Sequence, residues 1–403
     1  MEILKSLYRM TAFQAIFGHP SVLLMLFIGS VLLYLGIRKK YEPLLLVPIA
    51  FGIILANLPG GQMGVVPGES IALGKEHYMN LFEIAHKFGI MNFLYYALIK
   101  TGLLPPLIFM GVGALTDFGP MLRNLRLAFF GAAAQIGIFT VFLAAIGLGF
   151  TPREAGSLGI IGGADGPTAI YTTIKLAPHL LGPIAIAAYS YMSLVPVIIP
   201  LVVRGMVSKN ELKINMKEQD KLFPPKHKIK NLKLVKILFP ITMIIVIAIL
   251  VPTATPLLGM LFFGNLVKEI GSTVSRLTDA ATTTIMNSAT IFLGLTVGAT
   301  MTADVFLEPK TLGIIVGGFL AFSISIAGGI VAVKLYNVFS KKKINPLVGA
   351  TGLSAVPMAS RVANEIALKH DSGNHLLQYC MASNISGVIG SAVAAGVLMT
   401  FLA

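Results

Sequence analysis

The chain has 403 residues, of which 55% are hydrophobic and only 12% are charged. Soluble domains carry about a quarter charged residues, so this composition excludes an ordinary soluble enzyme and indicates an integral membrane protein. The formal net charge of +14 would also suit a nucleic-acid ligand. However, the basic residues fall between apolar runs, as they do in the loops of membrane proteins, and we predict no nucleic-acid partner.

Apolar runs of about 20 residues recur along the chain, which is typical of helices that span a bilayer. Residues 1–18 are expected to form a short amphipathic helix on the membrane surface. In the first half we predict spans at residues 22–36, 44–58, 93–115 (kinked at Pro105-Pro106), 127–150 and 181–203. Clusters of basic residues follow the first and third of these spans.

The stretch from Gly159 to Tyr171, GIIGGADGPTAIY, interrupts this apolar pattern between the fourth and fifth spans. Pro167 lacks a backbone donor and pushes the residue before it out of helical space. The glycines on either side of Asp165 allow backbone conformations that are closed to other residues. The stretch therefore predicts a broken helix with one carboxylate, Asp165, at the break.

The charge of the loops indicates how this broken helix lies in the membrane. The segment from Arg204 to Lys236 contains ten Lys and Arg residues, so we predict a cytoplasmic loop at 204–232. With Arg38–Lys40 and Arg123 also inside, the fourth span leaves the cytoplasm and the fifth returns to it. The segment between them, 155–176, then begins and ends outside, and we predict a re-entrant hairpin with its tip near Asp165.

The second half repeats this order of elements in the opposite orientation. A second interrupted segment, at 345–370, would begin and end on the cytoplasmic side. The predicted spans of this half lie at residues 234–251, 256–267, 281–297, 312–335 and 376–402. The two halves share weak sequence similarities, for example Gly113-Ala114 and Gly298-Ala299. We therefore predict an all-α polytopic membrane protein, an inverted repeat of residues 1–203 and 233–403 with about five spans and one broken hairpin each, as in transporters that bind ions and substrates near the midplane of the bilayer.

Asp165 is the only carboxylate well inside an apolar segment. An unpaired carboxylate is costly to bury, so an intramembrane acid by default indicates a proton or cation site. The alternative is a hairpin that stays outside the core, where Asp165 would only cap the helix that begins at Pro167.

The second hairpin reads NPLVGATGLSAVPMASR and supplies Asn345, Gly349, Ser354 and Arg361. The glycine would allow close backbone approach, and the guanidinium suits a planar carboxylate. Equally, Asn345 could begin a helix, Ser354 could be a packing residue, and Arg361 could simply mark the cytoplasmic end of the hairpin. These alternatives stay open on the residues alone.

The span after each hairpin carries further polar residues, Tyr191 in the first half and Asn384 in the second, with Ser391 nearby. Each could instead be a helix-packing residue. Together with Asp165, these side chains offer oxygen ligands for a hard cation such as Na⁺. The Cys and His set that zinc prefers is absent from these segments, since the chain has one cysteine, Cys380.

The motifs GIIGGADGPTAIY, AYSYM, NPLVGATGLSAVPMASRV and NISGVIGSAVAAGV resemble the β subunit of sodium-translocating, biotin-dependent decarboxylases. This family includes the oxaloacetate, methylmalonyl-CoA, glutaconyl-CoA and malonate decarboxylases. The resemblance covers nearly the full length. It implies that the chain removes CO₂ from carboxybiotin and moves Na⁺ outward across the cell membrane while a proton is consumed.

The resemblance also implies the residues that carry this activity. Asp165 would be the Na⁺ and proton coupling residue, with Tyr191 and Arg361 also catalytic. The implied Na⁺ site further includes Asn345, Gly349, Ser354 and Asn384, and carboxybiotin would meet Ser354 and Arg361.

The resemblance further implies a small membrane-anchored partner subunit. A biotin-carrying subunit and a carboxyltransferase subunit are also expected as partners, because the sequence shows neither a biotinyl-lysine motif nor a soluble carboxyltransferase domain. A homotrimer with elevator-like motion is implied as well. The alternative function is an elevator-type secondary symporter of Na⁺ and a carboxylate, in which Arg361 would hold the anion. Which carboxylic acid or acyl-CoA feeds the complex does not follow from the sequence.

Overall fold

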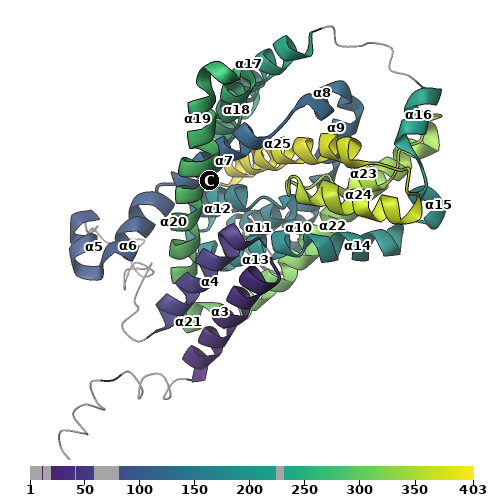
Figure 1. Cartoon of the computed structure of the whole chain (residues 1–403). Coiled ribbons are helices and arrows are strands. Elements are labelled where there is room, and N and C mark those ends of the chain that lie inside the picture. The colour runs from purple at the N-terminus through teal and green to yellow at the C-terminus, as the bar shows by residue number, and fades with distance from the viewer. Residues whose placement is uncertain (1–10, 12–19, 41, 59–80, 224–230) are drawn as a thin grey trace, which may run out of the picture.

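The computed structural model describes residue 11 and residues 20–40, 42–58, 81–223 and 231–403, so most of the expected surface helix at 1–18 lies outside it. The described residues form helices joined by short loops, with no β-strand among them. Figure 1 shows α25 near the middle of the molecule, with α9 and α24 beside it. This central helix also contacts α12, so elements from both halves of the chain meet around it.

The elements of the first half are α3 (Pro20–Arg38), α4 (Pro43–Asn57), α5 (Leu81–Phe88), α6 (Ile90–Leu94), the π-helical η2 (Tyr95–Ile99), α7 (Leu104–Leu115), α8 (Gly119–Arg123), α9 (Leu125–Ala134), α10 (Ile136–Gly147), α11 (Pro152–Gly159), the 3₁₀ turn η3 (Ile160–Gly163), α12 (Gly166–Leu176), η4 (Pro178–Leu180), α13 (Leu181–Ser193) and α14 (Val195–Met206). The remaining elements are α15 (Lys209–Leu212), α16 (Met216–Leu222), α17 (Leu232–Leu250), η5 (Pro252–Ala254), α18 (Thr255–Ile270), η6 (Ser272–Val274), α19 (Ser275–Asp279), the π-helical η7 (Ala280–Ile285), α20 (Met286–Ala299), α21 (Ala303–Phe306), α22 (Pro309–Phe339), α23 (Leu347–Ala350), α24 (Met358–His370) and α25 (Leu377–Leu402).

Six helical segments among the described residues are long and apolar enough to cross a membrane, and two bent helix pairs raise this number to eight. The chain is therefore a multi-pass membrane protein. The six are Pro20–Arg38, Leu125–Gly147, Leu232–Leu250, Ser272–Ala299, Pro309–Phe339 and Leu377–Leu402. The shorter α4 and α18 lie at the positions of two other predicted spans.

Two of the predicted spans are bent, and for the third span the sequence predicts a kink at this place. The third bends by 67° between Ile99 and Leu104, just before the predicted proline kink. The sequence predicts a continuous fifth span over 181–203, but α13 and α14 meet at 69°. Pro196 stands in the first turn of α14. A proline there supplies no N–H and its ring clashes with the carbonyl four residues earlier, so α13 cannot run on into α14.

Close helix pairs join the two halves of the chain. Gly113 on α7 lies directly against the carbonyl of Leu261 on α18, which leaves no room for a Cβ atom. Gly298 on α20 lies in the same way against the carbonyl of Ile49 on α4. Small residues allow membrane helices to approach this closely, because association in lipid depends on van der Waals packing.

The two ends of the segment 152–176 lie together. Thr151 and Glu154 form a reciprocal capping box at the start of α11. Glu154 Oε1 also lies 3.1 Å from His179 Nε2, beyond the end of α12, and 3.4 Å from Lys310 Nζ. Burial alone would raise the pKa of Glu154, but bonds from the Thr151 backbone, His179 and Lys310 lower that pKa to about 2. A single ionised carboxylate therefore ties the two arms of this hairpin.

In the second broken segment, two asparagine amides hold the flanking residues together by hydrogen bonds. Asn345 Nδ2, before α23, donates to the carbonyls of Leu212 and Ile214, both at 3.0 Å. Asn374 Nδ2, after α24, donates to the same two carbonyls at 3.3 and 3.0 Å. The residues that flank hairpin 345–370 thus meet at the C-terminal end of α15 and the loop that follows it.

Candidate cation site

The carboxylate of Asp165 is held at the break between η3 and α12. Ala164 adopts the left-handed conformation, with φ of 54°, which reverses the chain direction immediately before the acid. A non-glycine residue in this region costs about 1–2 kcal/mol, so surrounding contacts must maintain it. Asp165 is the N-cap of α12, and its Oδ1 accepts a 3.1 Å hydrogen bond from the Thr168 backbone N–H. The cap that the sequence suggested as an alternative is therefore present.

The same carboxylate also has partners far away in the sequence. Oδ2 of Asp165 accepts hydrogen bonds from Ser354 Oγ at 2.7 Å and from Ser391 Oγ at 3.0 Å. Ser354 lies at the break of the second hairpin, and Ser391 lies on α25. In addition, the Ser354 backbone N–H donates to the carbonyl of Gly163 at 3.0 Å. The breaks of the two hairpins therefore touch through both side chain and backbone, with Asp165 only 4% exposed.

Asn384 supports the Ser354 side of this contact. Its amide nitrogen donates to the carbonyl of Leu353, and its Oδ1 accepts a 3.0 Å hydrogen bond from Ser360 Oγ. Asn384 is fully buried. This amide therefore joins α25 to the non-helical backbone next to Ser354 and to the first turns of α24.

Gln135, between α9 and α10, is not among the residues that the sequence predicts for the site. Its Nε2 donates to the carbonyls of Gly131 and Gly352, at 3.0 and 3.1 Å. A Cβ atom built on Gly163 would lie 2.8 Å from Ser391 Cβ and 3.7 Å from Gln135 Oε1. The signal in the sequence is a lone amide within the apolar run AAAQIGIF.

The tyrosine that packs beside Asp165 is Tyr189, two residues before the expected Tyr191. The Tyr189 ring leaves no room for a Cβ on Gly166, the residue that follows the acid. Tyr191 instead donates its hydroxyl proton to the carbonyl of Ile315 on α22 and packs on Phe319 and other aromatic side chains. Both tyrosines stand in the motif AYSYM, so the sequence alone could not distinguish them.

Three other predicted residues have no direct contact with Asp165 in this structure. Asn345 closes the mouth of the second hairpin, and its Oδ1 accepts the Leu347 N–H at 3.0 Å. Gly349 lies against the backbone of Gly329, where α23 approaches α22. Arg361 lies exposed on α24, one turn after the break. The structure thus brings Asp165, Ser354 and the backbone bound by Asn384 together. Asn345, Gly349 and Arg361 lie apart from this cluster.

The donor atoms around Asp165 suit a hard cation. Hard cations prefer carboxylate, carbonyl and hydroxyl oxygens, and helix breaks in transporters supply such groups near the bilayer midplane. Gln135 Oε1 and Ser325 Oγ are buried without a hydrogen-bond partner among the described residues. The Ser325 hydroxyl lies near Gly162 of the same break. No group of three or more His, Cys, Asp or Glu side chains is found in the described parts of the chain, so the donor set does not resemble a site for zinc.

Comparison with known sequences identifies the family of the chain. The profile described as the Na⁺-transporting oxaloacetate decarboxylase beta subunit matches residues 21–402. The chain belongs to this family. Membership of a family of Na⁺-transporting decarboxylase subunits agrees with the helices that are long and apolar enough to cross a membrane.

Individual beta subunits are similar over nearly their full length. The chain is 46% identical to the methylmalonyl-CoA decarboxylase subunit beta of Propionigenium modestum, over 99% of each chain. It is 45% identical to the oxaloacetate decarboxylase beta chain 2 of Salmonella typhimurium, over 94% of each chain. The glutaconyl-CoA decarboxylase subunit beta of Acidaminococcus fermentans is 46% identical over 94% of this chain and 92% of its own. Since these relatives belong to complexes with different substrates, similarity at this level does not select one acid.

Proposed function

We propose that this beta subunit removes CO₂ from carboxybiotin carried by a partner subunit and couples that reaction to outward Na⁺ transport through Asp165. The observation that carries the proposal is the buried contact of Asp165 with Ser354, which links the breaks of two hairpins. The membership of the family supports Na⁺ transport and a decarboxylase complex.

The charge balance at Asp165 supports an exchange of Na⁺ and H⁺. Among the residues that the structure describes, no Lys, Arg or His forms an ion pair with this carboxylate. It accepts hydrogen bonds from two serine hydroxyls and one backbone N–H. A buried carboxylate without a cationic partner must bind a cation or a proton, because the ionised form is costly in a medium of low polarity. One carboxylate cannot hold both, so binding of Na⁺ releases the proton.

Decarboxylation of carboxybiotin consumes one proton. Loss of CO₂ breaks the bond between the carboxyl carbon and the biotin nitrogen, and the electron pair stays on nitrogen. One proton must then join that nitrogen. A site that gives up a proton when Na⁺ binds therefore couples the two processes with balanced charge.

The other predicted residues take roles around this exchange. Arg361 is exposed on α24 and has the planar donor fork that suits the carboxylate of carboxybiotin. Ser354 would meet both Na⁺ and this substrate. Tyr191 fixes α13 on α22 and stays the proposed catalytic tyrosine by resemblance. For Asn345 and Gly349, we propose that they act on the Na⁺ site by placing the hairpin that carries Ser354.

The packing supports an inverted repeat with ten crossings and two re-entrant hairpins. Under an exchange of the two halves, the pair α7–α18 corresponds to α20–α4, and both pairs are close contacts. The echoing residues Gly113 and Gly298 occupy these equivalent contacts. Each hairpin also returns to its own starting point. We further propose elevator-like motion, a homotrimer, an inner-membrane location and a cytoplasmic loop at 204–232.

The test uses the complex of this chain with its biotin-carrying, carboxyltransferase and small membrane-anchored partners, reconstituted in vesicles. We expect Asp165→Asn to abolish both Na⁺-dependent release of CO₂ from carboxybiotin and uptake of radioactive Na⁺. Asp279→Asn, at an exposed carboxylate at the end of α19, is the matched control and should retain both activities. Full coupled activity of Asp165→Asn would overturn the proposal, and Na⁺ transport without any CO₂ release would favour the symporter.

A further inference from the structure

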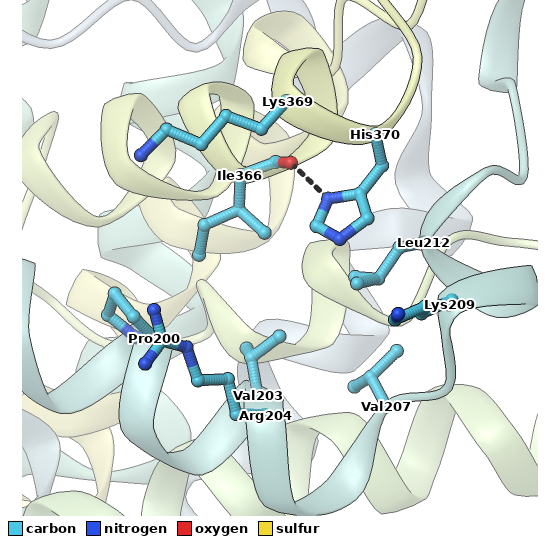
Figure 2. A pocket seen from close by; sticks show the side chains of 9 residues that line it. All are labelled: Pro200, Val203, Arg204, Val207, Lys209, Leu212, Ile366, Lys369 and His370. Carbon is cyan, nitrogen blue, oxygen red and sulfur yellow. Dashed lines mark hydrogen bonds between the residues drawn. The ribbon is translucent and has the colours of Figure 1, made fainter.

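A cavity of about 370 Å³ lies between α14, α15 and α24, away from the Asp165 site. Figure 2 shows the side chains from these three helices that line it. The lining is Pro200, Val203, Arg204, Val207, Lys209, Leu212, Ile366, Lys369 and His370. It therefore combines an apolar wall with basic side chains and contains no acidic residue.

The basic side chains of this cavity have no acidic partner at ion-pair distance among the residues that the structure describes. In the described part of the chain, Arg204, Lys209 and Lys369 form no ion pair. The carboxylates of Glu365 and Asp371, each next in sequence to a lining residue, do not themselves line the cavity, and Asp371 accepts a 3.3 Å hydrogen bond from Asn215 Nδ2. The cavity consequently has a net positive charge and suits an anion.

The position of the cavity favours an anion that also has an apolar part. Arg204 lies in the last turn of α14, at the end of a bent pair that is apolar enough to span the membrane. On the preceding turns, Val197 and Leu201 are 53% and 58% exposed. Residues three to four apart share one helix face, so this exposed apolar stripe leads directly to Arg204.

We propose that this cavity binds the phosphate headgroup of an anionic phospholipid, whose acyl chains lie along the exposed face of α14. Arg204 and Lys369 contact the phosphate, Lys209 on the opposite side of the cavity adds to its positive charge, and the apolar wall receives the glycerol and the first part of the chains. Basic pockets between membrane helices are a recurrent way to recognise anionic headgroups. A free phosphate would satisfy the charges but would leave the apolar wall and the stripe of α14 uncovered.

The experiment titrates the purified full-length chain in detergent with phosphatidylglycerol and follows its thermal midpoint. We expect phosphatidylglycerol to raise the midpoint of the natural chain and phosphatidylcholine to have little effect. Arg204→Gln with Lys369→Gln should require about 30-fold more lipid, since each basic residue near an anionic lipid surface contributes about fivefold. The charge-keeping variant Arg204→Lys with Lys369→Arg should stay close to the natural chain.

The matched control removes two lysines of the same basic segment that do not line the cavity, Lys213→Gln with Lys217→Gln. It should retain the response to phosphatidylglycerol. An equal response in the Arg204 and Lys369 double Gln variant would overturn the proposal. So would an equal response to phosphatidylcholine, displacement of the lipid by inorganic phosphate, or stabilisation that depends only on self-association of the chain.

Discussion

Ser354 Oγ donates a 2.7 Å hydrogen bond to Asp165 Oδ2, although 189 positions separate the two residues along the chain. Each residue lies at the break of a different hairpin, and each break exposes backbone that a regular helix would satisfy. The contact places a carboxylate and a hydroxyl together in buried protein, where their interaction is not screened by water.

Ser354→Ala tests whether this contact forms part of the Na⁺ site. We expect the half-saturating Na⁺ concentration for decarboxylation to rise about tenfold or more, because a hydrogen bond to a charged group contributes about 1.5–3 kcal/mol. Ser391→Ala should have a smaller effect, since Ser391 shares its single hydroxyl proton between Asp165 Oδ2 and the carbonyl of Val388. Ser323→Ala is the control, as its hydroxyl bonds only its own helix. Unchanged Na⁺ dependence in Ser354→Ala would contradict the assignment.

Gly166→Ala tests the close packing of Tyr189 beside Asp165. The added Cβ would collide with the Tyr189 ring. We expect a loss of about 1–3 kcal/mol in stability, which is the usual cost of overpacking, together with loss of Na⁺-dependent activity. In the double variant Gly166→Ala with Tyr189→Leu, the ring is removed, and we expect part of the lost thermal midpoint to be restored. Gly313→Ala, where the added Cβ meets open space, should leave stability unchanged. Equal midpoints for Gly166→Ala and Gly313→Ala would refute this packing.

Glu154→Gln tests the carboxylate that ties the arms of the first hairpin. We expect a loss of about 1–2 kcal/mol in stability at neutral pH, comparable with loss of an N-terminal helix cap. Because the folded-state pKa of Glu154 is lowered to about 2, its ionised form stabilises the fold fully above the unfolded-state pKa. This contribution is lost as the pH falls from about 4.3 toward the folded-state value.

The measurement compares the thermal midpoints of the natural chain and Glu154→Gln across this pH range. The difference should be constant from neutral pH to about 5 and then narrow as the Glu154 carboxylate protonates. Glu308→Gln is the control, because Glu308 is exposed at the start of α22 and makes no side-chain cap. A difference in thermal midpoint that becomes larger as the pH falls would contradict the expected loss of the Glu154 contribution in acid.

Asn345→Ala and Asn374→Ala distinguish a direct Na⁺ ligand from a residue that places the hairpin. Both amides donate to the carbonyls of Leu212 and Ile214. We expect both variants to lose similar thermal stability, about 1–3 kcal/mol for the unpaired buried groups. Their half-saturating Na⁺ concentrations should also change by a similar factor. A much larger Na⁺ effect in Asn345→Ala alone would identify Asn345 as a ligand.

The sequence predicted the helical membrane class and most element positions because apolar runs and proline positions are local signals. It also singled out Asp165, since a lone carboxylate in an apolar segment has a large desolvation cost wherever the chain places it. Ser354 and Asn384 were suggested by family resemblance, while the residues alone left packing roles open for both.

The tertiary structure decided which of these residues meet. Gln135, Ser391 and Tyr189 lie around the break that carries Asp165, because α25, the junction of α9 and α10, and α13 all pack on the first hairpin. Asn345 and Asn374 instead close a loop around two carbonyls. Hydrogen bonds form over about 3 Å, so they depend on the relative placement of elements far apart in the chain, and no local pattern encodes that placement. Local chemistry therefore predicts that Asp165 needs a cation or a proton, and packing alone determines which oxygen atoms lie beside its carboxylate.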